Sequence, residues 1–140
     1  MPDHEAHEHA VRFLFHPLLV HFPIAFYFLE LILILFWIFR HDDAYKRFAL
    51  FSFRFGYLAM LAALAAGWRD AGGWQNITGE VREHFLGAVS VFVFYTCRAF
   101  YWKLAKPEWP MDKWLQLAQV AIGYGLVVWT ALHGGELVYG

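Results

Sequence analysis

The chain has 140 residues and a formal net charge of −1, and 60% of its residues are hydrophobic and 21% aromatic. A soluble domain of this length has too small a core to bury so much apolar surface, so the composition excludes an ordinary soluble fold. The near-zero charge gives no support for a nucleic-acid partner, and we expect none. The composition therefore predicts a polytopic integral membrane protein in contact with the lipid bilayer.

Four apolar segments are long enough to cross the hydrocarbon core, which takes roughly 20 helical residues. In lipid each segment must satisfy its own backbone hydrogen bonds, so each is predicted to be a helix. Short connections between them favour an all-α, antiparallel four-helix bundle that forms a single domain over residues 1–140, with a polar N-terminal arm at 1–15. The predicted spans are residues 17–39, 48–68, 85–102 and 114–133.

The first span opens with two histidines and two prolines, within residues 16–23. Pro17 suits the first position of a helix, where the missing N–H would have no partner in any case. Pro23 frees a carbonyl one turn earlier and is expected to kink the helix near His21. Because five residues turn a straight helix by about 140°, His16 and His21 can both face the bundle only with such a kink.

Glu30 lies near the middle of the first span, where a lone carboxylate is costly in lipid. Folding the first two spans about residues 40–44 sets Glu30 opposite Arg54 at about the same depth. We therefore predict a structural ion pair between Glu30 and Arg54 that locks this hairpin. Arg98 of the third span is a competing partner. A carboxylate that relays protons or contacts a quinone is the functional alternative.

His84 begins the third span and His133 ends the fourth, so both lie at the same level as His16 and His21. Asp70, in the second connection, belongs to the same face and could orient an imidazole through its second ring nitrogen. Imidazoles from three helices at one depth are typical of a metal or heme-iron site. The predicted cofactor ligands are His21, His84 and His133, supported by His16, and Asp70 joins all four histidines as a metal-site residue.

Glycines beside these histidines bear on the identity of the cofactor. Gly87 lies one turn beyond His84 and Gly134 follows His133, an arrangement that lets a flat macrocycle approach the backbone. Such glycines are also common at close helix contacts. With Cys97 as the sole cysteine there is no motif for covalent heme attachment, so a heme here would be heme b. A compact copper, zinc or iron site is the alternative.

Charged residues at the ends of the spans predict the orientation of the bundle. Basic residues gather at the first and third connections, whereas the opposite face is richer in acids. By the positive-inside rule the basic face is cytoplasmic. Both termini and the histidines would then lie outside, at the periplasmic face of a bacterial inner membrane. The basic residues are Arg40, Lys46, Arg47, Lys103, Lys106 and Lys113.

Three stretches of the chain resemble one known family. They are residues 16–25, residues 67–70, and residues 133–139, with His84 between the last two. Over nearly its whole length the chain is similar to a family of predicted bacterial membrane proteins, the domain of unknown function 2231. The resemblance implies a four-helix membrane domain and singles out His16, His21, Asp70, His84 and His133. It implies no activity.

We expect a small membrane redox protein or subunit rather than a stand-alone enzyme. It would hold one heme b or transition metal near the outer face and take electrons from a donor such as quinol. The alternative is a cofactor-free accessory subunit that self-associates or packs against a larger respiratory or photosynthetic complex. Its docking surface would be the aromatic lipid-facing residues Phe26, Phe28, Phe92, Phe94 and Tyr95.

Overall fold

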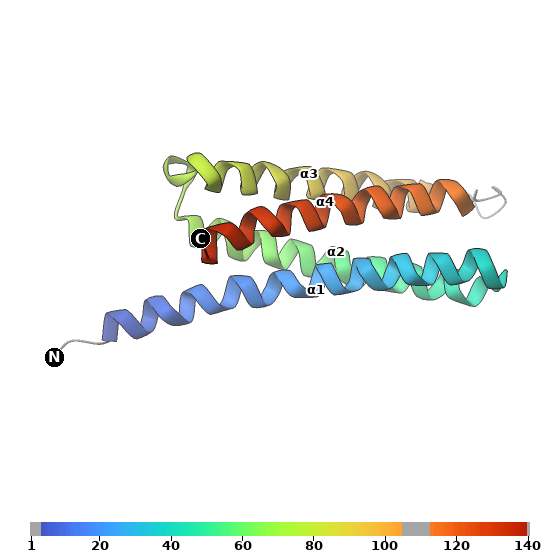
Figure 1. Cartoon of the computed structure of the whole chain (residues 1–140), viewed down its shortest axis with the longest axis horizontal. Helices are drawn as coiled ribbons and strands as arrows, with labels where there is room; N and C mark the ends of the chain where they lie inside the picture. The colour runs from blue at the N-terminus through green and yellow to red at the C-terminus, as the bar shows by residue number, and fades with distance from the viewer. Residues whose placement is uncertain (1–3, 105–112, 140) are drawn as a thin grey trace.

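The computed structural model describes the backbone of residues 4–104 and 113–139, and the side chains of residues 18–104 and 113–134. Four of its helices are long and apolar enough to cross a membrane, and the described ranges contain no strand, which confirms the predicted all-α fold. The helices run alternately in opposite directions (Figure 1). They are α1 (His4–Arg40), α2 (Asp43–Ala71), the 3-10 turn η1 (Trp74–Asn76), α3 (Gly79–Leu104) and α4 (Lys113–Tyr139).

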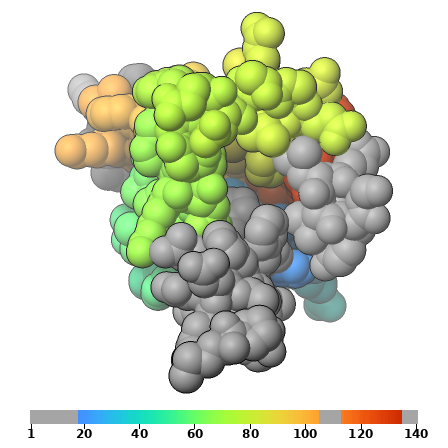
Figure 2. Space-filling model, turned by 90° about the vertical axis from the view of Figure 1, so that its left-hand side faces the viewer, coloured from blue at the N-terminus to red at the C-terminus, as the bar shows by residue number. Residues whose placement is uncertain are grey.

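The bundle has two chemically different ends. One end holds the α2–α3 connection, the start of α3 with His84 and the last turns of α4 with His133, and we call it the histidine end. The other holds the α1–α2 turn and the start of α4, with Arg40, Lys46 and Lys113, and we call it the basic end. Figure 2 looks at the histidine end, with the last turns of α2 in green and the start of α3 in yellow-green.

Helix α1 is longer than the sequence predicted. It begins at His4 instead of Pro17, so residues 4–15 of the predicted polar arm belong to the helix. Neither glycine nor proline occurs between His4 and His16, so this stretch lacks the residues that disfavour a helix interior. Pro23 is accordingly an interior, buried residue of a helix that continues past it on both sides.

Helix α2 is set by well-defined caps. Asp42 has an extended backbone, and its carboxylate accepts a hydrogen bond from the N–H of Ala44 at 2.8 Å, which starts the helix after a two-residue turn. At the other end Gly72 adopts the left-handed conformation (φ 70°) and donates its N–H to the carbonyl of Arg69. A left-handed residue there is the common way for a helix to stop. Between these caps α2 runs from the basic end to the histidine end.

Buried residues recur every three or four positions along each helix, the spacing found in supercoiled bundles. This stripe turns one side of α1 and one side of α4 toward the interior. Because the opposite sides are largely exposed, they are left to contact lipid in a membrane. The stripe on α1 comprises Pro23, Tyr27, Glu30, Ile34 and Trp37, and that on α4 comprises Gln116, Val120, Gly123, Val127 and Thr130.

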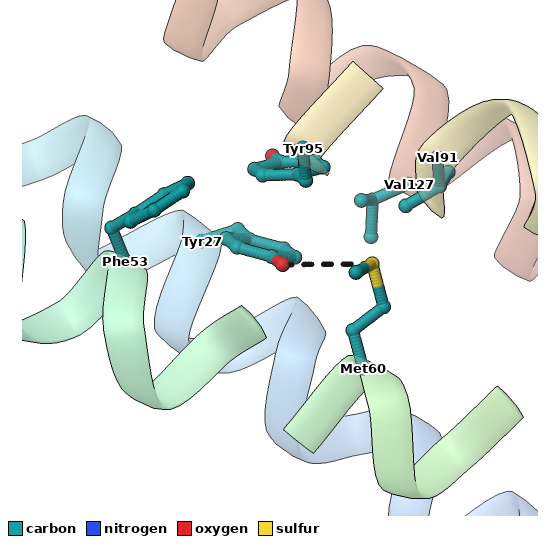
Figure 3. Close-up of a cluster of buried hydrophobic side chains, with 6 residues drawn as sticks. All are labelled: Tyr27, Phe53, Met60, Val91, Tyr95 and Val127. Atoms are coloured by element: carbon teal, nitrogen blue, oxygen red, sulfur yellow. Dashed lines mark hydrogen bonds between the residues drawn. The ribbon is translucent and has the colours of Figure 1, made fainter. Parts of the chain in front are cut away.

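The centre of the core is aromatic (Figure 3). The rings of Tyr27 and Tyr95 stack with centroids 3.8 Å apart, and the Tyr27 hydroxyl donates to the sulfur of Met60 at 3.7 Å. Phe53 lies beside this pair, with its ring centroid 6.1 Å from that of Tyr95. The prediction that Tyr95 faces lipid is therefore wrong. Its residue spacing from Val91 places it on the buried stripe of α3.

The helices pack as two hairpins that meet mainly through α1 and α4. Helices α2 and α3 touch in few places, and one of these is a 3.0 Å hydrogen bond between the hydroxyls of Tyr57 and Thr96. The α2–α3 connection is held by aromatic contacts, because Trp74 lies edge-on to both Trp68 and Phe85 with centroids 4.8 Å and 5.8 Å away. The start of α3 is thereby fixed beside the end of α2.

Candidate functional site

Helices α3 and α4 approach each other closely at the histidine end. A Cβ added to Gly87 would lie 2.7 Å from Thr130 Oγ1, and one added to Gly134 would lie 2.7 Å from His84 Cε1. Real Cβ atoms do not make contacts that short, so only glycine allows this approach. Gly134 thus provides the space in which the imidazole of His84 rests against α4.

The ring of His84 is oriented by the backbone of α4. Its Nδ1 lies 3.1 Å from the carbonyl oxygen of Thr130. A carbonyl oxygen only accepts hydrogen bonds, so Nδ1 carries a proton, and in the neutral form of the ring the lone pair is then on Nε2. The hydroxyl of Thr130 donates to the carbonyl of Leu126 at 2.8 Å, which holds Thr130 in turn.

His133 has the same arrangement within its own helix. Its Nδ1 lies 2.9 Å from the carbonyl oxygen of Trp129, and the two rings lie 4.5 Å apart. The lone pair of His133 is therefore also on Nε2. Both imidazoles are half-buried, at one end of the bundle, and in the tautomer that metal-ligating histidines commonly adopt when a carbonyl holds the second nitrogen.

The structure does not turn His21 toward the bundle. Its side chain is exposed, whereas Pro23 two positions later is buried. Two residues rotate a helix by about 200°, so the two side chains lie on nearly opposite sides of α1. The expected effect of Pro23, to swing His21 inward beside His16, is therefore not seen for His21. The side chain of His16 lies outside the described residues.

Asp70 is an exposed residue of the last turn of α2. Among the side chains described, residues 18–104 and 113–134, no three His, Cys, Asp or Glu residues lie close enough together to hold a metal ion. Of the predicted site, the described residues therefore bring His84 and His133 to one end of the α3–α4 hairpin without assembling three donors.

Glu30 forms a buried ion pair, but with Arg98. Glu30 Oε1 accepts from Arg98 Nη2 at 2.7 Å and Oε2 accepts from Nη1 at 3.2 Å, and the two residues are 0% and 3% exposed. The guanidinium also lies 5.0 Å from the ring centroid of Phe53. The prediction of Arg54 as the partner is wrong, because Arg54 follows the buried Phe53 by one residue and is turned out of the bundle.

Sequence reasoning missed the buried amide of Gln116. It is 0% exposed, and neither atom of its amide has a hydrogen-bond partner among the described residues. The register that pairs Gly134 with His84 and Gly123 with Tyr95 sets Gln116 level with Trp102. The spacing from Gln116 to Val120 and Gly123 was the available signal, because it continues the buried stripe of α4.

Comparison with known proteins identifies a family to which the chain is similar. The family model described as "Predicted membrane protein (DUF2231)" matches residues 13–140. The chain belongs to the DUF2231 family. The DUF2231 match covers all four spans and the four predicted histidine ligands, His16, His21, His84 and His133, and it confirms the resemblance seen in the sequence. No curated protein and no solved structure matches the chain.

Proposed function

We propose that this DUF2231 protein is a small membrane electron-transfer protein or subunit that binds one transition metal or heme b at its histidine end. His84 and His133 are the proposed ligands. The observation that supports the proposal is their shared tautomer, because each ring has Nδ1 against a carbonyl and its lone pair on Nε2. In both rings this leaves Nε2 as the nitrogen that would act as the metal donor.

The contacts favour a metal ion over a heme. His84 itself fills the space over Gly134, so a macrocycle does not fit between α3 and α4 at this position. An ion requires only the two Nε2 lone pairs and further donors. Imidazole suits copper, iron and zinc, and of these copper and iron change oxidation state in electron transfer. When bound, such an ion would supply a one-electron couple.

The chain's own residues would orient and tune this site. The carbonyls of Thr130 and Trp129 keep the protons on Nδ1 and fix the orientation of both rings. His16 and Asp70 are proposed as the supporting residues at the same end, and the outward-facing His21 is not among them. Basic residues at the other end support an orientation with the histidine end on the periplasmic side of a bacterial inner membrane, within reach of quinol.

The test is the metal and heme content of the purified protein. Protein from cells supplied with copper and iron should carry a stoichiometric metal, measured by elemental analysis, with an absorption spectrum that changes on reduction with dithionite. H84Q and H133Q should lose it. H41Q is the matched control, because His41 lies at the basic end, where its Nδ1 is 3.0 Å from Lys113 Nζ.

Two other results have definite meanings. A pyridine-hemochrome signal with stoichiometric heme would replace the metal ion with heme b, bound outside the α3–α4 contact. A colourless, metal-free protein from well-supplied cells would contradict both. The cofactor-free accessory subunit would then stand, with His84 serving only to hold α3 against α4.

A further inference from the structure

Arg54 is a lipid-facing charge in the middle of a membrane span. The midpoint of α2 (Asp43–Ala71) is residue 57, and Arg54 lies three residues before it. The side chain of Arg54 is exposed. A guanidinium facing hydrocarbon is costly unless an anion accompanies it. In the described part of the chain no carboxylate pairs with Arg54, and Glu30 is held by both terminal nitrogens of Arg98. The compensating anion must therefore come from outside this part of the chain.

The direction of α2 indicates where that anion lies. Helical side chains lean toward the N-terminus of their helix, and α2 begins at the basic end. Arg54 therefore leans toward Arg47, which precedes it by seven residues on the same face and is also exposed. The rise between them is about 10 Å, a distance that one long side chain largely spans. Two guanidiniums on one face suit a phosphate oxygen pair.

An apolar groove runs beside these arginines. It has a volume of about 300 Å³ and lies between α1 and α2 on the outer surface of the bundle. The hydroxyl of Ser52 is its only polar lining group and already donates to the carbonyl of Phe26 at 2.6 Å. The groove therefore offers van der Waals contact and little else. It is lined by Phe26, Leu29, Leu33, Phe48, Phe51, Ser52 and Phe55.

The arginines do not line the groove but are near neighbours of its lining residue Phe51 along α2. Phe51, a lining residue, lies one turn beyond Arg47 and three residues before Arg54. On α1 the exposed Arg40 follows the lining residue Leu33 by seven positions, so it lies beyond the groove at the basic end. An apolar groove with three exposed arginines near it in sequence is complementary to an acyl chain that carries an anionic head. A carboxylate of a partner protein would pair with one arginine and would not account for the apolar groove.

We propose that Arg47 and Arg54 bind the phosphate of an anionic phospholipid in the leaflet at the basic end, and that one of its acyl chains lies in the α1–α2 groove. Clustered basic residues at a membrane surface attract anionic lipid by about 1 kcal/mol each, which is about fivefold in affinity. The groove converts that general attraction into a defined binding site. This site is independent of the proposed metal site at the opposite end.

The experiment measures lipid preference in the purified full-length protein. Phosphatidylglycerol and phosphatidylcholine are titrated into detergent-solubilised protein, with bound lipid counted by native mass spectrometry and the melting temperature followed in parallel. We expect phosphatidylglycerol to bind in preference and to raise the melting temperature. R54Q and R47Q should each lower that preference about fivefold. R69Q is the matched control, an exposed arginine of the same helix at the histidine end.

A second variant tests the groove without changing any charge. L29W places an indole among the lining residues and should weaken retention of phosphatidylglycerol while Arg47 and Arg54 remain. Equal binding of the two lipids by the wild type would overturn the proposal. So would an unchanged preference in R54Q and R47Q, or an R69Q effect as large as theirs. Loss of a co-purifying protein from R54Q, without lipid selectivity in the wild type, would assign the anion to a partner's carboxylate instead.

Discussion

The two arginines nearest the middle of the membrane spans, Arg98 and Arg54, are accommodated in opposite ways. Arg98 is buried with Glu30 in a two-point ion pair and lies against the rings of Phe53 and Tyr95. Arg54 is exposed and has no carboxylate among the described residues. The depth of a charge in the membrane thus does not decide its partner. The face of the helix decides it, because that face determines whether protein or lipid surrounds the group.

The largest effect should come from breaking the buried pair. E30Q leaves the Arg98 guanidinium charged and unpaired in the core, and this should lower the free energy of unfolding by about 3–5 kcal/mol. Reversible unfolding in mixed detergent measures it. The double variant E30M/R98M removes both charges and should recover most of the loss. An E30Q protein as stable as the wild type would show that the pair does not hold the bundle together.

A smaller loss is expected where α3 meets α4. G134A places a methyl group 2.7 Å from His84 Cε1 and 2.9 Å from its Nδ1, and the ring cannot move without losing the carbonyl of Thr130. Overpacking of this kind costs about 1–3 kcal/mol. The same assay should find G125A close to the wild type, because a Cβ at Gly125 meets nothing within 4 Å. Equal stabilities of G134A and G125A would refute the close contact.

The smallest effect, and the one that most sharpens the contrast between the arginines, concerns Arg54. In vesicles of phosphatidylcholine alone, R54L removes an uncompensated charge and should not lower stability. With phosphatidylglycerol present it should lose about 1 kcal/mol of lipid-dependent stabilisation. Thermal unfolding in the two lipids gives both values. If R54L destabilised the protein equally in both, Arg54 would have a structural role like that of Arg98.

Residue patterns predicted the architecture well and the contacts less well. The four spans follow from length and hydrophobicity alone, which is why their number and antiparallel order are correct. The start of α1 was misplaced because Pro17 suits a first turn, yet nothing before it ends the helix. The partner of Glu30 was misassigned because counting from the turn fixes depth but not rotation. Val91, Tyr95 and Arg98 are buried and lie three or four residues apart, and this spacing indicates which side of α3 faces the bundle.

For the histidines too, the sequence predicts the position along the bundle but not the direction in which each side chain points. The order of the spans correctly sets His84 and His133 at one end of the bundle. It does not reveal that His21 points outward, because that depends on how strongly Pro23 bends α1. Nor does it reveal that Gly134 accommodates an imidazole in place of a macrocycle, because the same glycine permits both. These details require the packing of specific side chains.

The proposed site depends on His84 and His133 presenting Nε2 as a metal donor. The most direct measurement is the ¹⁵N chemical shift of their ring nitrogens in labelled protein, recorded before and after addition of a diamagnetic ion such as Zn²⁺ or Cu⁺. We expect a protonated Nδ1 in both rings throughout, and a shift of both Nε2 signals on metal addition that saturates at one ion per chain. A protonated Nε2 before addition, or Nε2 signals that do not respond to metal, would contradict it.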